Sequence, residues 1–529
     1  MKDMKIAELL LVICVFMAFP VPADAGKEPS YAGSASCRDC HERFYKLWST
    51  SMHGLAMQPY TAEFAKARLG PQTSPIAIGK FGYLADITAG EVIESGPQGT
   101  KRYRIAHVLG GKNVYYFLTP LDKGRLQTLP VAYDVQKKEW FDTAASGVRH
   151  FPTGEQGEAV DWQHYTYTFN TACYSCHVSR LDTNYDIDTD TYHTTWAEPG
   201  INCETCHGPS AAHNEIARAT PKGQPLPELR IISTKAMTTA QRNDSCSGCH
   251  AKAGLLTPAY MPGERFYDHY DLSTLEDPDF YPDGRDLGEN YTLNSWSLSP
   301  CAKSGQLDCM HCHTSSGRYR FKQENFNHAC LPCHEDKVQN PAAHTRHPVE
   351  SEGSKCVSCH MPMTSFARMN RSDHSMLAPT PAATMAYQSP NACNLCHQDQ
   401  DAKWADQLVR QWRSRDYQAP VLERAALIDA ARKRDWTKFA EMMAYIADPR
   451  ARRGLCRLAD QADSAGAGSE APGRFAWRRQ ESVTPGARRR RSGAGADPVG
   501  GEPAGADRGH GRRLPAGAGE VGGSARGFS

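Results

Sequence analysis

Between residues 309 and 397 the sequence reads CMHCH (309–313), CLPCH (330–334), CVSCH (356–360) and CNLCH (393–397). Four further copies of this Cys-x-x-Cys-His pattern precede them: CRDCH (37–41), CYSCH (173–177), CETCH (203–207) and CSGCH (246–250). The pattern is typical of c-type haem attachment, because two thiols at this spacing form thioethers with the haem vinyl groups and the adjoining histidine ligates the iron. The chain is therefore expected to carry eight covalently bound haem c groups.

Each motif supplies two attachment thiols and one proximal iron ligand. The expected thiols are Cys37, Cys40, Cys173, Cys176, Cys203, Cys206, Cys246, Cys249, Cys309, Cys312, Cys330, Cys333, Cys356, Cys359, Cys393 and Cys396. The expected proximal ligands are His41, His177, His207, His250, His313, His334, His360 and His397. A Cys-x-x-Cys pair alone is also typical of half a zinc site or of a redox-active pair. The histidine that follows all eight pairs favours haem.

Thirteen histidines lie outside the proximal set, which is enough to give each iron a second imidazole. The histidines predicted as distal ligands are His53, His193, His213, His328, His347 and His374. His150, His164, His269, His311 and His344 are further histidines available for ligation, whereas His107 falls in a predicted strand and is expected to be structural. If protein fills both axial positions, the iron passes electrons and does not bind substrate.

The composition of the chain bears on its partners, its core and its cysteines. The 60 basic and 59 acidic residues nearly balance, so charge gives no reason to expect a nucleic-acid partner. Hydrophobic residues make up only 40% of the chain, and buried porphyrins would supply the missing apolar surface. Sixteen of the 19 cysteines lie in the motifs, so no disulfide framework is expected, and Cys301 is interpreted as a buried structural thiol.

The N-terminus reads as an export signal over residues 1–25. Lys2 and Lys5 precede an apolar stretch, and Ala23-Asp24-Ala25 forms a small-residue cleavage site. No later segment approaches the ~20 apolar residues of a membrane-spanning helix. We therefore expect a periplasmic or cell-surface protein without a transmembrane segment in the mature chain.

The motif spacing divides the rest of the chain. Residues 26–72 form a first haem segment, 73–165 an inserted β-rich module, 166–397 a core with seven haems, and 398–452 a short helical, repeat-like segment. Residues 103–109, 114–119, 126–134 and 139–142 are predicted strands of an antiparallel meander. The predicted fold class is thus a mostly α and irregular multihaem cytochrome core wrapped around eight haems, with an antiparallel β module and C-terminal α-helices.

Helical spacing of apolar residues predicts helices over 403–413, 421–433 and 438–447. Residues 453–529 are rich in Gly, Ala, Arg and Pro and contain no Lys, Asn, Ile, Met or Tyr. These five are the residues encoded largely by A- and T-rich codons, so one hypothesis is that the tail is a frame-shifted translation of a GC-rich gene. The alternative is a disordered basic tail, since this composition cannot sustain a packed core.

Several segments carry a resemblance to a known group. The ordered motifs, Ser51-Met52-His53-Gly54, the segment from Trp196 to Cys203, and Arg371-Ser372-Asp373-His374 resemble exported octahaem c-type cytochromes with C-terminal helical repeats. That group is similar to the superfamily of the ammonia-oxidiser tetrahaem cytochrome, pentahaem nitrite reductase and octahaem hydroxylamine oxidoreductase. The resemblance implies a haem-binding fold and, in the enzymes, one open iron. All eight motifs here end in His, so the Lys-ligated catalytic haem usual in the nitrite reductases is missing.

The expected function is electron transfer along closely packed haems in a respiratory or extracellular chain. Other redox proteins or a membrane quinol-linked donor would be its partners, with a further partner possible on the C-terminal helices; the sequence leaves the oligomeric state open. One alternative is an oxidoreductase acting on nitrite, hydroxylamine or tetrathionate at one open haem. The other is an assembly protein whose helical repeats bind partners.

Overall fold

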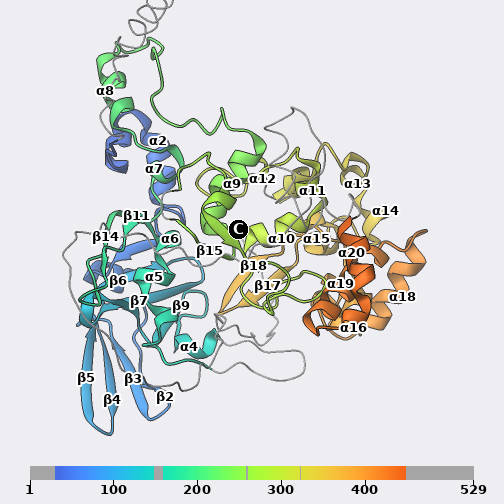
Figure 1. Ribbon diagram of the computed structural model, residues 1–529, viewed down its shortest axis with the longest axis horizontal. Helices are drawn as coiled ribbons and strands as arrows, with labels where there is room; N and C mark the ends of the chain where they lie inside the picture. Colours follow the sequence, from blue (N-terminus) through green and yellow to red (C-terminus); the bar gives the residue numbers. More distant parts are fainter. Residues whose placement is uncertain (1–29, 148–158, 258–259, 322, 448–529) are drawn as a thin grey trace, which may run out of the picture. The chain divides into compact units, whose positions relative to one another are not determined.

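Short helices and small antiparallel sheets alternate along the chain in the computed structural model (Figure 1). The structure describes residues 30–147, 159–257, 260–321 and 323–447. These residues belong to one of two units; the other unit, Cys456–Leu514, lies outside the described residues. The predicted signal peptide, His150 and the tail from residue 453 also lie outside them.

Two antiparallel sheets form the β-rich module. The first has the order β1–β6–β7–β9–β10, with β8 paired to β7, and its strands are β1 Met57–Pro59, β6 His107–Gly110, β7 Val114–Pro120, β8 Leu126–Thr128, β9 Val131–Asp134 and β10 Glu139–Asp142. The second has the order β2–β3–β4–β5, with β2 Ile76–Ile78, β3 Phe81–Asp86, β4 Glu91–Gly96 and β5 Gly99–Arg104. Antiparallel pairing of the strands in this part of the chain agrees with the prediction.

The strand boundaries differ from the prediction in three ways. The predicted strand 103–109 is divided between β5 and β6, and 126–134 is divided at Pro130, which has no backbone N–H for a ladder. The sheet β2–β5 was not predicted apart from its last two residues. β1 lies within the predicted first haem segment, yet Met57 pairs with Leu109 of β6.

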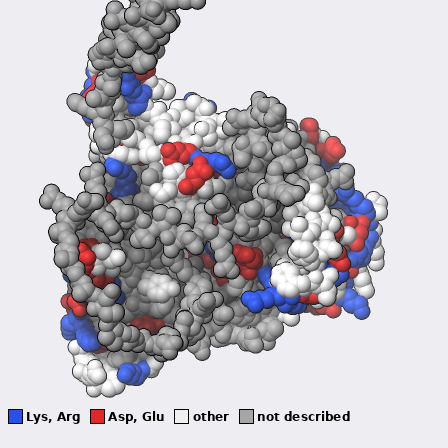
Figure 2. Space-filling model, viewed as in Figure 1, with Lys and Arg blue, Asp and Glu red and all other residues white. Residues whose placement is uncertain are grey.

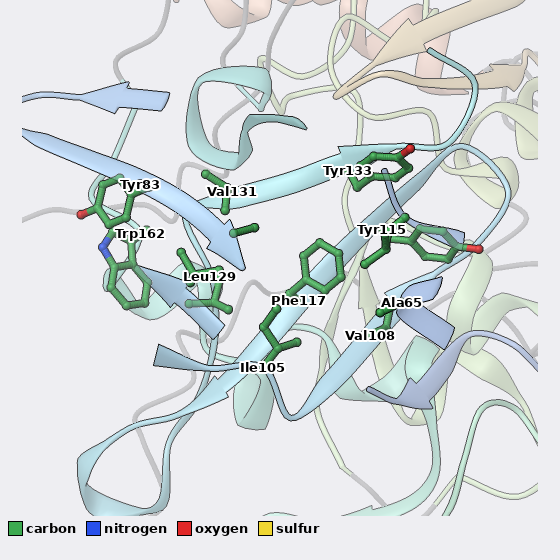
Figure 3. Close-up of a cluster of buried hydrophobic side chains, with 13 residues drawn as sticks. Ala65, Tyr83, Ile105, Val108, Tyr115, Phe117, Leu129, Val131, Tyr133 and Trp162 are labelled. Carbon is green, nitrogen blue, oxygen red and sulfur yellow. The ribbon is translucent and has the colours of Figure 1, made fainter. Parts of the chain in front are cut away.

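A cluster of buried side chains joins the two sheets (Figure 3). Phe117 is fully buried and stacks on Trp140 at 5.2 Å between ring centroids, while Val92 contributes from the second sheet. Alternation along β3 and β4 sends every second side chain inward, as expected for strands with one buried face. This core holds the two sheets against each other.

The motif residues lie on or beside short helices: η1 Ser34–Cys37, α2 Arg38–Ser49, α6 Tyr174–His177, α7 Cys203–His207, α9 Thr239–His250, α12 Cys309–Cys312, η5 Gln323–Cys330, α15 Cys356–His360 and α17 Ala392–Cys396. The remaining α-helices are α3 Ala62–Arg68, α4 Thr143–Ser146, α5 Phe169–Ala172, α8 Ala211–Ala219, α10 Thr292–Leu298, α11 Pro300–Ser304, α13 Glu335–Gln339, α14 Pro341–Thr345 and α16 Pro381–Tyr387. Four two-stranded antiparallel sheets lie between these helices: β11 Val178–Asp182 with β14 Thr195–Pro199, β12 Tyr185–Asp186 with β13 Thr191–Tyr192, β15 Ala253–Leu255 with β16 Tyr270–Leu272, and β17 Met363–Phe366 with β18 Met369–Ser372.

Three helices follow the last motif: α18 Ala402–Trp412, α19 Ala419–Arg432 and α20 Phe439–Ala447. Each lies within two residues of its predicted range at both ends. In the part of the chain that the structure describes, none of the helices has the length and hydrophobicity needed to span a membrane. Acidic and basic side chains of the described residues are interspersed on the face shown in Figure 2.

Candidate haem sites

Polar side chains fix the first turn of several motif helices. Asn202 accepts a hydrogen bond from the Thr205 amide at the start of α7, and Asp308 accepts one from the Met310 amide at the start of α12. Asn391 accepts from the amide of Cys393, the first thiol of the last motif. These caps satisfy amides that have no partner within the helix, so they hold each short motif turn in place without a long helix.

Five motif histidines each face a second histidine. The ring centroids are 6.1–6.5 Å apart in the pairs His41–His213, His53–His250, His313–His374, His344–His360 and His347–His397. A metal ion between two imidazoles makes bonds of about 2 Å to each, and the half-width of each ring brings the centroids to roughly 6 Å apart. The spacing of all five pairs therefore fits one iron between two histidines.

Hydrogen bonds to backbone carbonyls determine which ring nitrogen of three of these histidines is free to bind a metal. Nδ1 lies 2.7 Å from the Leu229 carbonyl in His213, 2.8 Å from that of Ser372 in His374, and 2.7 Å from that of Thr345 in His347. A carbonyl can only accept, so Nδ1 carries the proton and Nε2 keeps its lone pair for a metal. Burial lowers the pKa of His250 to about 4, which keeps that imidazole neutral at neutral pH.

Four of the predicted distal histidines, His53, His213, His347 and His374, lie beside a motif histidine. The structure does not bring the other two to a motif histidine: His193 is exposed, with Nε2 3.2 Å from Thr191 Oγ1, and His328 is exposed in η5. His344, which pairs with His360, was not in the predicted ligand set. Like His347, it lies in the short connection between the sixth and seventh motifs, and this location is the sequence signal that could have identified it.

Three motif histidines do not face a second histidine ring within the described part of the chain: His177, His207 and His334. Nδ1 of His177 lies 2.6 Å from the Ala56 carbonyl, and Nδ1 of His207 lies 2.9 Å from that of Ile232. By the same reasoning, both rings present an unprotonated Nε2 to a metal. Their second axial positions are not assigned to a histidine by this structure.

Motifs distant in sequence contact one another. Helix α7 contacts η1, α9 contacts both α6 and α12, and α15 contacts both η5 and α17. The Cys249 thiol donates to the Ser175 carbonyl at 3.1 Å, which joins the second and fourth motifs. His311 Nε2 lies 3.0 Å from the Ala329 carbonyl, which joins the fifth and sixth. These contacts therefore join the first motif to the third, and the second motif and the fourth to eighth motifs to one another.

The residues around the motifs fit haem better than zinc. A zinc site needs three or four Cys, His or carboxylate ligands around one point. Throughout the described ranges, no group of three or more such side chains is arranged to hold a metal ion. Apolar side chains instead stand exposed beside the motifs: Phe44 is 65% exposed, with its ring 6.5 Å from that of His41, and Leu395 is 38% exposed. A covalently held porphyrin would cover such surface.

Comparisons with known proteins agree with these features. The model of the family described as cytochrome c554 and c-prime matches residues 134–208, which contain the second and third motifs. Comparison with curated protein sequences finds no match. The family match and the repeated motifs support a multihaem c-type cytochrome with covalently bound haem c.

Three solved structures are similar to this chain at low identity. The outer cell wall cytochrome OcwA is 17% identical with a TM-score of 0.48, covering 78% of this chain and 91% of its own. The undecahaem cytochrome from the S-layer of Carboxydothermus ferrireducens is 16% identical with a TM-score of 0.37, and the match covers 78% of this chain and 67% of that chain. The Wolinella succinogenes octahaem sulfite reductase MccA is 12% identical with a TM-score of 0.31, and the match covers 66% of this chain and 58% of that chain.

Proposed function

We propose that this protein is an exported electron carrier that passes electrons along eight closely packed haem c groups. The observation that carries the proposal is the set of five histidine pairs with centroids 6.1–6.5 Å apart. An iron with imidazole on both sides has no position for substrate, so such haems exchange electrons and do no bond chemistry. The bound haem supplies the Fe(III)/Fe(II) couple; the chain's own residues fix its position and tune its potential.

Contacts between motifs support a path for the electrons. The first motif meets the third through η1 and α7, and the fourth meets the fifth through α9 and α12. Burial raises the pKa of the Cys206 thiol to about 12 and the charge of the Cys246 thiol adds to this rise, so we infer that the third motif lies near the fourth. The sixth, seventh and eighth motifs follow through η5, α15 and α17. The second motif joins as a branch, because its helix α6 contacts α9 of the fourth.

The proposal is tested on the mature, haem-loaded protein by electron paramagnetic resonance and by stepwise reductive titration. We expect the five paired haems to give low-spin signals that ignore added ligands, and the haems to be reduced over a range of potentials within one connected chain. Haem content and intact mass give the number of haems, for which eight is expected. Predominantly high-spin signals would contradict the proposal, because they would mean that the histidine pairs do not hold iron.

A second candidate function is an oxidoreductase with one open haem that acts on a small nitrogen or sulfur compound. The three motif histidines that face no second histidine among the described residues favour it.

We also propose that the protein is exported to the periplasm or cell surface. Its partners would be other redox proteins or a quinol-linked donor, with a further partner on α18–α20. Detection of the mature chain beginning at Gly26 outside the cytoplasm would support the export part, and a chain retaining residues 1–25 in the cytoplasm would contradict it.

A further inference from the structure

We propose that fixed charges give the haem chain a direction. Two glutamates beside the first and third motifs, Glu204 and Glu198, lower the reduction potential of those haems, and Arg320 on the fifth motif raises the potential of the fifth haem. The inference rests on the electron transfer proposed above and adds its direction. Electrons move from the first and third haems toward the fifth, because transfer to a haem of higher potential is favourable.

Glu204 joins the third motif to the segment that precedes the first. It belongs to the Cys-x-x-Cys-His run of residues 203–207, and it is only 3% exposed. Its carboxylate accepts hydrogen bonds from the Ala32 amide at 2.8 Å and from the Gly33 amide at 2.9 Å. It also accepts from the amide and the hydroxyl of Ser210, at 3.0 and 2.7 Å. The carboxylate is therefore held between the third motif and the start of the first.

Glu198 places a second carboxylate on the same segment. Both of its oxygens lie 3.1 Å from the Ser34 amide, and Oε2 also accepts from Asn202 Nδ2 at 2.6 Å. The buried Ser34 in turn accepts a hydrogen bond through Oγ from the Cys203 amide at 3.3 Å. Two carboxylates therefore meet at the start of η1, whose last residue is the first thiol of the first motif.

Neither carboxylate is neutralised within the described part of the chain. Their partners there are backbone amides, one side-chain amide and one hydroxyl, and none of these carries a positive charge. Both oxygens of each group accept hydrogen bonds, as a carboxylate ion does, whereas a neutral carboxyl would have to donate from one oxygen. Burial also weakens the screening of charge by salt. The two glutamates therefore add uncompensated negative charge beside the first and third haems.

The fifth motif has the opposite balance of charge. Asp308 caps α12, but Arg242 Nε lies 2.6 Å from its Oδ2, so this pair is neutral. Arg320 is a second arginine at the same motif, and its Nε donates to the carbonyl of Met310 at 3.0 Å and to that of His313 at 2.9 Å. A carbonyl carries no net charge. Arg320 therefore adds a positive charge directly to the fifth motif.

The two kinds of charge act on iron with opposite signs. Reduction adds an electron to the iron, so nearby negative charge opposes it and positive charge favours it. A unit charge about 10 Å away changes the reduction equilibrium about tenfold at an effective dielectric constant near 20, which is about 59 mV for one electron. The first and fifth sites both have a histidine pair, so the axial ligands are alike and the charges decide their order.

The experiment follows individual haems in the mature, haem-loaded protein. His213→Ala and His374→Ala should each convert one haem to high-spin. The low-spin paramagnetic resonance signal that each variant loses identifies the first and the fifth haem, respectively. Both signals are then followed during reductive titration of the unaltered protein. We expect the first haem to have the lower reduction potential.

Three charge variants test the cause of this order. In Glu204→Gln, the reduction equilibrium constant of the first haem should rise about tenfold, and that of a second haem, the third, should rise with it. In Arg320→Gln, the constant of the fifth haem should fall by only about threefold, because Arg320 is exposed and its charge is screened. Glu204→Asp keeps the charge on a shorter side chain, so the first haem should stay near its original potential.

Glu42→Gln is the matched control. Glu42 follows His41 directly and is closer in sequence to the first haem than Glu204 is. Its side chain is 61% exposed, however, and it pairs with Lys46 at 2.7 Å. The variant removes the same charge as Glu204→Gln, and we expect the first haem's equilibrium constant to change less than about twofold.

Three results would overturn the proposal. The first is an unaltered protein in which the first haem has a higher potential than the fifth, which requires no variant to fold. The second is a Glu204→Gln or Arg320→Gln protein whose haem potential moves no more than in Glu42→Gln. The third is an equal rise in Glu204→Asp and Glu204→Gln, which would mean that the hydrogen bonds and not the charge set the potential. The low-spin signals of the paired haems would remain in each case, so failure here is distinguishable from failure of the electron-transfer proposal.

Discussion

Replacing His374 by alanine tests the proposed haem ligation most directly. The His374 and His313 rings face each other at 6.5 Å between centroids. After truncation, the nearest side-chain atom of residue 374 would lie roughly 5–6 Å from an iron bound to His313, far beyond a metal–nitrogen bond of about 2 Å. Water or an open position would replace the imidazole, so the expected result is conversion of one haem from low-spin to high-spin.

The expected size of the change follows from the motif count. One haem in eight should change, so roughly one-eighth of the total haem should move into the high-spin signal in paramagnetic resonance and optical spectra. Added imidazole should restore the low-spin signal, because it can occupy the space left by the side chain. Loss of the hydrogen bond to the Ser372 carbonyl should lower stability by only about 1 kcal/mol, so the variant should fold.

His193→Ala is the matched control for this experiment. His193 is exposed and is not recorded beside any motif histidine of the described residues, so its removal should leave the spectrum unchanged. An unchanged spectrum in His374→Ala would refute the assignment of His374 as a ligand. A change in both variants would show that the high-spin signal reports general disruption.

Three further predictions concern stability. Phe117→Ala should lower the unfolding free energy by about 3–5 kcal/mol in a denaturant titration, since the side chain is fully buried, whereas a change at the exposed Thr100 should have little effect. Lys252→Ala should lower the unfolding free energy by about 3–5 kcal/mol, because buried Asp279 loses its Lys252 partner. The double variant Lys252→Ala/Asp279→Leu should lose less, and a larger loss in the double variant would contradict this reasoning. Burial raises the pKa of Asp286, and neither of its carboxylate oxygens has a hydrogen-bond partner within the described part of the chain. In the folded protein this carboxyl therefore keeps a proton that it releases above about pH 4 in the unfolded chain. The unfolding free energy should consequently fall as the pH rises above about 4. Asp286→Asn should remove this slope and stabilise the protein at pH 7, while urea midpoints near pH 3 stay unchanged.

The motifs and the last three helices were predictable because their signals are local. A Cys-x-x-Cys-His run identifies its own chemistry within five residues, and apolar spacing predicts α18 to within two residues at each end. The sheet β2–β5 was largely missed because short strands such as Ile76–Ile78 carry few periods of alternation. Its stability comes from packing against the other sheet, which no single strand reveals.

The pairing of the histidines could not be predicted because it depends on long-range contacts. His41 meets His213, and no spacing rule links residues so far apart in sequence. His328 stands immediately before a motif and was expected to be a ligand, but it is exposed in η5, while His344 faces His360.

The pair formed by His41 and His213 has a consequence for biogenesis. A ribosome adds about 5–20 residues per second, so the 172 residues that separate the two histidines take roughly 10–35 s to synthesise. During that interval the first haem site has its own imidazole but not the one from α8, whereas His344 precedes its partner His360 in the chain and is already present. Among the five paired sites, the first is therefore the one that waits longest for its second imidazole after its own motif has been synthesised.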